Sequence, residues 1–439
     1  MAKKDKKSTS RKARDEDLDD NMSDTSLTIS DSIEGSDEEE NEKDWEDKLL
    51  DAIDGLTEKR ATTRLSNLQT VYDIMSEKHA KAALKGRIDT LTHGVITCVQ
   101  RGTSDKECIL GIETLSLITI TVGSPQGAKP IRGSDDSLHL SDELRQRVRE
   151  LLTLKCVEGK SNDANQNVRH AAVMALAIVA FVEDDGREVA SEMGMCKKFE
   201  DTYMSKEPDM SILAQAITGW TLMASITPTH IQASSLLQRI KPRLIKCLNK
   251  GDLNVKIACG EALALLYEAV HKDLRHAEDE GEFSDEEILK ETDDEWMAQL
   301  NQLSTQTTKQ VAKKDRSVQK SSFRDIIETI EQGTRPQVKF IVKKTTLTFD
   351  DWRSIVQYNA LRTVLGSGLI HHVSDNEFVR DVFNVSDVVF DEKSARKLNK
   401  DQKQALLSKK SHHKKMDTID KAMRTRSSHD LTIFDTSYD

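Results

Sequence analysis

An internal repeat in the middle of the chain constrains the fold more than any other feature. Residues 167–177 (NVRHAAVMALA) match residues 254–264 (NVKIACGEALA), which lie 87 residues further on. Half of this offset is about 43 residues, the length of an armadillo or HEAT repeat. A middle copy at residues 209–220 (DMSILAQAITGW) shares the polar start and the spacing of small residues. The sequence therefore predicts an all-α armadillo/HEAT-like helical repeat solenoid.

The repeated pattern has a physical explanation. Its polar first residue caps a helix, its basic residue faces solvent, and its alanines let the helix of the neighbouring repeat approach closely. We expect the alanines at equivalent positions of the two copies to be buried, namely Ala171, Ala175, Ala258 and Ala262. The alternative is a set of unrelated amphipathic helices that share Ala-Leu by chance.

Helical spacing extends well beyond the repeated blocks. From residue 56 onward apolar residues recur three and four apart, as at Leu65, Leu68, Val71 and Met75, which is the period of a helix. Strand patterns are nearly absent before Val338, and aromatic residues make up only 4% of the chain, so aliphatic side chains must form the core. We expect one continuous stack of helices over residues 56–271.

Composition divides the chain into four parts: a head (1–45), a repeat domain (46–312), a C-terminal domain (321–385) and a tail (386–439). Residues 1–14 carry seven Lys/Arg against one Asp, and residues 15–54 carry 18 Asp/Glu against two Lys. The head has too little apolar surface to offset its ordering entropy and should be disordered.

Ser36 precedes acidic residues in the pattern that acidophilic kinases use. Ser284 has the same pattern but also fits a helix cap, so Ser36 is the favoured phosphosite.

The C-terminal domain is predicted to be a small α+β unit. Its expected elements are a helix at 323–331, strands at 338–342 and 345–349, a helix from the Asp350 cap to Gly366, and a short helix at 376–383. His371 and His372 lie between the last two helices and are candidate partner contacts. The alternative for His371 is a packing or capping histidine.

The tail is strongly basic, because residues 393–426 carry 12 Lys/Arg against three Asp. An apolar stripe from Ala395 to Leu406 indicates a weakly amphipathic helix. We predict that its cations bind RNA phosphates: Lys393, Arg396, Lys397, Lys400, Lys403, Lys409, Lys410, Lys414, Lys415, Lys421, Arg424 and Arg426. A solvated tail or a nuclear import signal is the alternative.

Charge, cysteines and hydropathy exclude several classes of protein. The net charge of −11 argues against a generic nucleic-acid binder, although it allows a local basic segment. Six dispersed cysteines are typical of free thiols in a reducing compartment. No apolar stretch follows the basic start, and the longest apolar run, residues 171–182, is short of the roughly 18 residues that span a bilayer. We expect a soluble cytoplasmic and nuclear protein without a membrane partner.

Motifs for catalysis fail at specific residues. Residues 159–161 (GKS) would need glycine at position 154 for a phosphate loop, where Leu154 stands, and residues 366–368 (GSG) lack the third glycine of a dinucleotide fingerprint. The pairs His371-His372 and His412-His413 each supply too few ligands for structural zinc. We expect no enzyme, metal, cofactor or small-molecule substrate.

Several C-terminal motifs occur together: residues 322–325 (SFRD), Trp352, 365–368 (LGSG) and 376–383 (NEFVRDVF). Together they resemble the C-terminal domain of the interferon-related developmental regulator family, and the acidic head, helical body and basic tail extend that resemblance over nearly the whole chain. The resemblance implies non-catalytic regulators of gene expression during differentiation.

For some members the resemblance implies ribosome-bound repressors of translation, whose C-terminal helix occupies the mRNA path. The first hypothesis for this chain is therefore binding of the ribosome and its RNA through the tail, which represses translation. The alternative is a nuclear transcriptional co-regulator that binds regulatory proteins through the groove of the repeats.

Overall fold

The fold is a row of paired helices in a computed structural model. The structure describes residues 38–385 apart from 103, 125–137, 158–165, 184–193, 206, 208, 227–231, 281–293, 306–312 and 343–344. The helices pair in chain order: α1 (Glu38–Gly55) with α2 (Ala61–Glu77), α3 (Ile88–Arg101) with α4 (Asp105–Val122), α5 (Asp142–Val157) with α6 (Gln166–Glu183), α7 (Met195–Phe199) and the π-helical turn η2 (Glu200–Met204) with α8 (Met210–Ala224), α9 (Gln232–Lys250) with α10 (Leu253–Glu280), and α12 (Asp294–Thr305) with α13 (Lys313–Gln332).

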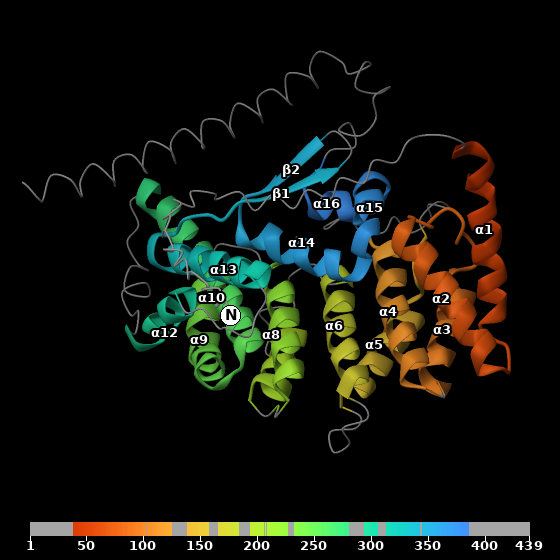
Figure 1. Cartoon of the computed structure of the whole chain (residues 1–439), viewed down its shortest axis with the longest axis horizontal. Helices are drawn as coiled ribbons and strands as arrows, with labels where there is room; N and C mark the ends of the chain where they lie inside the picture. Colours follow the sequence, from red (N-terminus) through yellow and green to blue (C-terminus); the bar gives the residue numbers. More distant parts are fainter. Residues whose placement is uncertain are drawn as a thin grey trace, which may run out of the picture.

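These pairs stack into two layers. The second helices of successive pairs, α2, α4, α6, α8 and α10, each contact the next one, and the first helices form the other layer. Figure 1 shows the pairs standing side by side along the length of the molecule. Helix α13 packs against α10 and continues the stack. The predicted helical repeat solenoid is confirmed.

Small residues allow the close contacts between repeats. Ala175, Ala258 and Ala262 are buried as predicted, whereas Ala171 is only partly buried. At Gly219 of α8 an added Cβ would lie 2.7 Å from the Cβ of Ala177 on α6, so a larger side chain there would push the helices apart.

Two expectations about the repeated pattern were wrong. Arg169 does not face solvent: its side chain is 3% exposed, and its Nη2 lies 2.7 Å from Oε2 of Glu207. Its guanidinium is buried because this carboxylate, which the alignment of repeats did not include, neutralises it. Asn254 does not cap α10 either, since the backbone N–H of Val255 donates to Oδ1 of Asp252, three residues before it. In the middle copy Asp209 does cap α8.

The C-terminal elements largely match their predicted bounds. Strands β1 (Val338–Val342) and β2 (Thr345–Phe349) form an antiparallel hairpin with Val338 opposite Phe349. Helix α14 (Trp352–Leu365) is capped by Asp351, one residue after the predicted cap Asp350, and it ends at Gly366, where φ is +55°. The helical turn η3 (Gly366–Gly368), α15 (Leu369–Asp375) and α16 (Glu377–Val382) follow, and Asn376 caps α16.

Helices α14 to α16, here called the strap, lie across the second-layer helices (Figure 1). The last carbonyls of a helix have no partner within it, and the strap supplies partners at several helix ends. Its polar contacts run from α2 to α10: His372 Nε2 to the Met75 carbonyl (3.1 Å), Asn376 Nδ2 to the Ile120 carbonyl (3.1 Å), Gln357 Nε2 to the hydroxyl of Ser225 (3.0 Å), and the Trp352 N–H to the Glu268 carboxylate (2.8 Å).

The hairpin and the strap make up the predicted small C-terminal α+β unit, and the strap packs along the solenoid. The predicted boundary at residue 321 lies inside α13, and the boundary at residue 46 lies inside α1. A composition change marks neither start, because α1 begins within the acidic tract and α13 begins within a polar stretch.

Candidate binding groove

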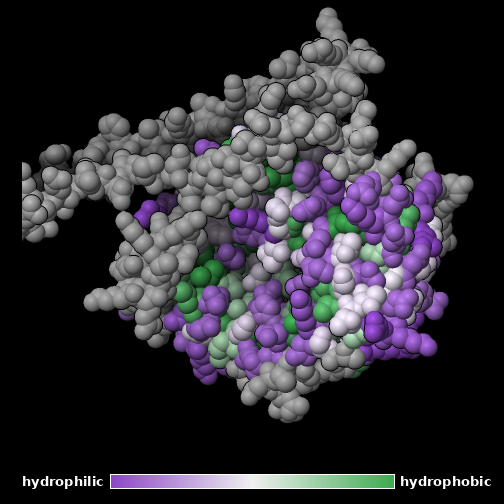
Figure 2. Space-filling model, turned by 45° about the vertical axis from the view of Figure 1, so that its right-hand side comes forward, coloured by the Kyte–Doolittle hydropathy of each residue, from purple (hydrophilic) through white to green (hydrophobic). Residues whose placement is uncertain are grey.

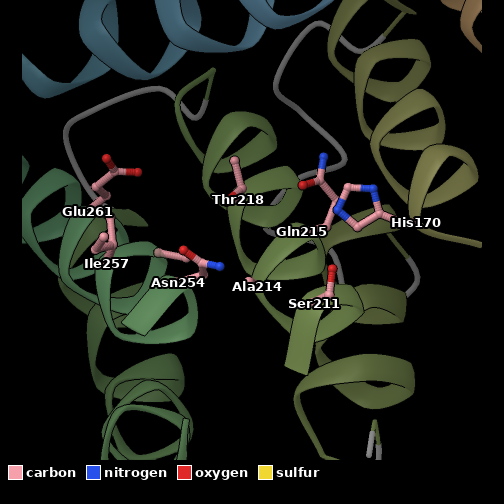
Figure 3. A pocket seen from close by; sticks show the side chains of 9 residues that line it. His170, Ser211, Ala214, Gln215, Thr218, Asn254, Ile257 and Glu261 are labelled. Carbon is pink, nitrogen blue, oxygen red and sulfur yellow. The ribbon is translucent and has the colours of Figure 1, made fainter. Parts of the chain in front are cut away.

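A small hollow, here called the groove, opens between the second-layer helices of three consecutive repeats. Its lining comes from α6, α8 and α10, and its volume is about 200 Å³. Figure 3 shows these side chains on neighbouring helices, with α14 above them. Pockets for small molecules usually measure about 300–1,000 Å³. This hollow therefore suits one or two side chains of a partner protein better than a whole small molecule.

Polar, mostly uncharged groups line the groove. Asn254 of α10 and Gln215 of α8 carry amides, and Ser211 and Thr218 of α8 carry hydroxyls. Amide and hydroxyl groups both donate and accept hydrogen bonds, so they can pair with the backbone of an extended peptide. His170 of α6 completes this wall; burial lowers its pKa, and the nearby Asp209 carboxylate acts in the opposite direction.

Glu261 is the acidic residue that lines the groove. It lies on α10, is partly buried, and has its pKa raised to about 7 by desolvation. Near neutral pH its carboxylate is thus only partly ionised. A cationic or hydrogen-bond-donating group in the groove would favour the ionised form.

A hydrogen-bonded network positions the start of α8, which lines the groove. Glu207, held by Arg169, accepts a hydrogen bond from the backbone N–H of Asp209 at 3.3 Å. Asp209 in turn accepts from the N–H groups of Ser211 and Ile212 at 2.9 and 3.1 Å. This chain of contacts fixes the first turn of α8, and Ser211 lies in that turn.

One face of the described surface is largely polar (Figure 2). Figure 2 shows one face as mainly hydrophilic, with small, separate hydrophobic patches. The large hydrophobic residues that are exposed among the described residues are Leu154 and Ile341. The groove is therefore distinguished by its shape and its convergent polar groups.

The two predicted histidines have different surroundings. His372 is fully buried and bonds the Met75 carbonyl, so its interpretation as a partner contact is wrong: it is a structural residue that joins α15 to α2. Burial lowers its pKa to about 4 and that of the neighbouring His79 to about 3. His371 is exposed, which removes the packing alternative, and it caps neither neighbouring helix, because Gly368 stands at the N-cap of α15 and Asn376 caps α16.

The remaining predicted site residues lie outside the described residues. They are the possible phosphosites Ser36 and Ser284 and all the tail cations from Lys393 to Arg426.

Sequence reasoning did not identify the groove residues, although the repeat contained a signal. Ser211 and Asn254 lie 43 residues apart, as do Thr218 and Glu261, so each pair occupies one register position of the repeat. Polar residues that recur outside the apolar stripe of each helix mark the same face of successive helices.

Among the described residues, no group of three or more His, Cys, Asp or Glu could hold a metal ion, and no helix is long and apolar enough to cross a bilayer.

Stacked helix pairs whose second helices contact one another in order define a helical-repeat protein. The chain matches the model of the interferon-related developmental regulator family over residues 17–331. It belongs to this family.

Curated relatives extend the similarity over most of the chain. Interferon-related developmental regulator 1 of Homo sapiens is 26% identical over 373 residues, which cover 83% of this chain and 76% of the relative. Interferon-related developmental regulator 2 of Mus musculus is 27% identical, with 83% and 79% covered. An uncharacterized protein of Schizosaccharomyces pombe is 23% identical, with 77% and 74% covered.

Proposed function

We propose that this chain is a non-enzymatic regulator of gene expression that binds ribosomal RNA through its basic tail and represses translation. The observation that carries the proposal is the set of 12 Lys/Arg at residues 393–426, C-terminal to the strap. Membership of a family whose relatives are named developmental regulators supports a regulatory role. Such a protein would act in the cytoplasm and also enter the nucleus.

The proposed mechanism is electrostatic. The strap is fixed across the helix ends by hydrogen bonds from α2 to α10, so the tail starts from a rigid body. Cations that neutralise phosphates release counterions, and affinity then falls steeply with salt. A tail held in an RNA-lined channel would exclude mRNA from that channel.

Deletion of residues 393–439 tests this function. The truncated chain should lose co-sedimentation with ribosomes at about 0.1 M salt and should no longer repress a reporter mRNA in a cell-free translation system. A matched control deletes only residues 427–439, which contain no Lys or Arg, and should behave like the parent. Unchanged co-sedimentation and reporter translation after the longer deletion would refute a binding role for the tail.

The groove supports a second candidate function, in which the protein is a nuclear transcriptional co-regulator that binds regulatory proteins. The observation that favours it is the set of hydrogen-bonding groups that three repeats direct into one hollow. Thr218→Arg would fill the hollow, whereas Gln146→Arg places the same side chain on the exposed surface of α5. Proteins that co-purify from nuclear extract with the parent and the Gln146 variant should be missing with the Thr218 variant. Equal recovery with all three chains would contradict this function.

A further inference from the structure

The first-layer helices differ sharply in charge along the solenoid. Helix α1 carries nine acidic and two basic residues, α5 carries three acidic and four basic residues, and α9 carries five basic residues and no acidic one. In a chain of net charge −11, α9 is a local concentration of positive charge. It lies far along the stack from α1 (Figure 1).

A buried carboxylate holds the arginines of α9 in place. Glu200 of η2 has a fully buried side chain, and its Oε1 lies 2.7 Å from Nη2 of Arg239. The same oxygen accepts from the indole N–H of Trp220 at 3.1 Å. Arg243, one turn further along α9, donates to Asp201 at 3.0 Å and lies 3.7 Å from Glu200. Its side chain remains 33% exposed, so this guanidinium is oriented and still reaches the surface.

The next two turns of α9 each present one cation. Lys246 and Lys250 are exposed, and neither takes part in an ion pair within the described parts of the chain. They follow Arg243 at intervals of about one turn, which places them on the same side of the helix. Lys198 of α7 is also exposed and lies close in sequence to the η2 carboxylates that hold the arginines.

We propose that the outer face of α9, together with Lys198, is a second nucleic-acid-binding surface that contacts RNA phosphates. This face is called the α9 face, and its cations are Lys198, Arg243, Lys246 and Lys250. It is distinct from the groove, which the second-layer helices line. The inference deepens the proposed function and rests on it, because it assigns a second contact with the same RNA.

The side chains of this face favour RNA over an acidic protein. Besides the two lysines, the exposed positions of α9 include Gln238, Pro242 and Asn249. Hot spots of protein interfaces are enriched in Trp and Tyr as well as Arg, and no aromatic residue is among the exposed residues described on this face. Lys, Arg, Asn and Gln are, in contrast, the side chains that bond phosphate oxygens.

The test compares the full-length chain with two double variants of equal charge change. Lys246→Gln with Lys250→Gln alters the α9 face, and Lys106→Gln with Arg147→Gln removes two exposed cations elsewhere. Affinity is measured for a labelled double-stranded RNA and for purified ribosomes over a series of salt concentrations. The α9 variant should lower the salt slope by about 1.4–1.8, from about 0.7–0.9 per lost contact, and the control should retain the parent slope. Circular dichroism checks that all chains are folded.

Repeating the series in the chain that lacks residues 393–439 separates the two proposals. If the α9 variant lowers the slope in both backgrounds, the surface is supported, even where the tail deletion alone changes nothing and the tail function fails. If the α9 variant keeps the parent slope while the tail deletion reduces it, the α9 proposal is overturned and the tail function stands. If the α9 variant instead loses only binding of a synthetic peptide of residues 15–37, the face binds acidic protein and the RNA assignment is wrong.

Discussion

The ion pair of Arg169 with Glu207 gives the sharpest test of how the solenoid is held together. The two side chains are 3% and 1% exposed, and their charged atoms lie 2.7 Å apart. Arg169→Met leaves the Glu207 carboxylate buried without a cation and removes the donor to the Cys156 carbonyl, which Arg169 Nε contacts at 3.0 Å. Breaking one side of a buried pair costs about 3–5 kcal/mol. Because folded domains are stable by only about 5–15 kcal/mol, this loss should be large.

Urea unfolding at pH 7, followed by far-ultraviolet circular dichroism, measures the change in the free energy of unfolding. The double variant Arg169→Met with Glu207→Gln removes both charges and keeps an acceptor for the Asp209 N–H, so it should recover most of the loss. Arg147→Met on the exposed surface of α5 is the control and should stay within about 0.5 kcal/mol of the parent. A single variant within about 1 kcal/mol of the parent, or a double variant no more stable than the single one, would refute the reasoning.

Three further predictions concern packing and pH. Ala175→Phe overpacks a buried contact of α6 and should cost about 1–3 kcal/mol; a melting temperature equal to the parent's would show that this helix is misplaced. His372, with its pKa lowered to about 4, contributes stability that is complete above about pH 6.5 and is lost as the pH falls toward 4. His372→Gln should therefore lose less stability over that interval in urea titrations, and equal pH slopes would count against the assignment. Burial raises the pKa of Glu268 to about 7, so the free energy of unfolding falls as the pH rises toward 7 and the buried carboxyl group ionises. Glu268→Gln, whose carbonyl can still accept from Trp352, should gain on the parent between pH 5 and 8; no gain would mean that the carboxylate is not desolvated.

Local sequence signals predicted much of the fold. The repeat offset predicted that the helices beginning near residues 167, 209 and 254 are equivalent, and α6, α8 and α10 are the second helices of consecutive pairs. The β-branched alternation predicted both strands with their observed bounds. Each of these features depends on residues close together in the chain, where periodicity and capping act.

Long-range contacts could not be predicted in the same way. The burial of Arg169 depends on Glu207, 38 residues later, and the role of His372 depends on a carbonyl 297 residues earlier. The groove residues belong to three different helices, so only their shared register position in the repeat could have indicated the groove. The position of the strap depends on contacts with helix ends that no local pattern encodes.

The strap also has a consequence for synthesis of the chain. Helical-repeat proteins normally depend on contacts between neighbours, so their first repeats can fold as soon as they leave the ribosome. Here the Met75 carbonyl gains its partner only when His372, 297 residues later, has been made. At roughly 5–20 residues per second, that interval lasts about 15–60 s. During this time the growing N-terminal repeats have water at the helix ends that the strap later covers, so they reach their final stability only after the strap has been made.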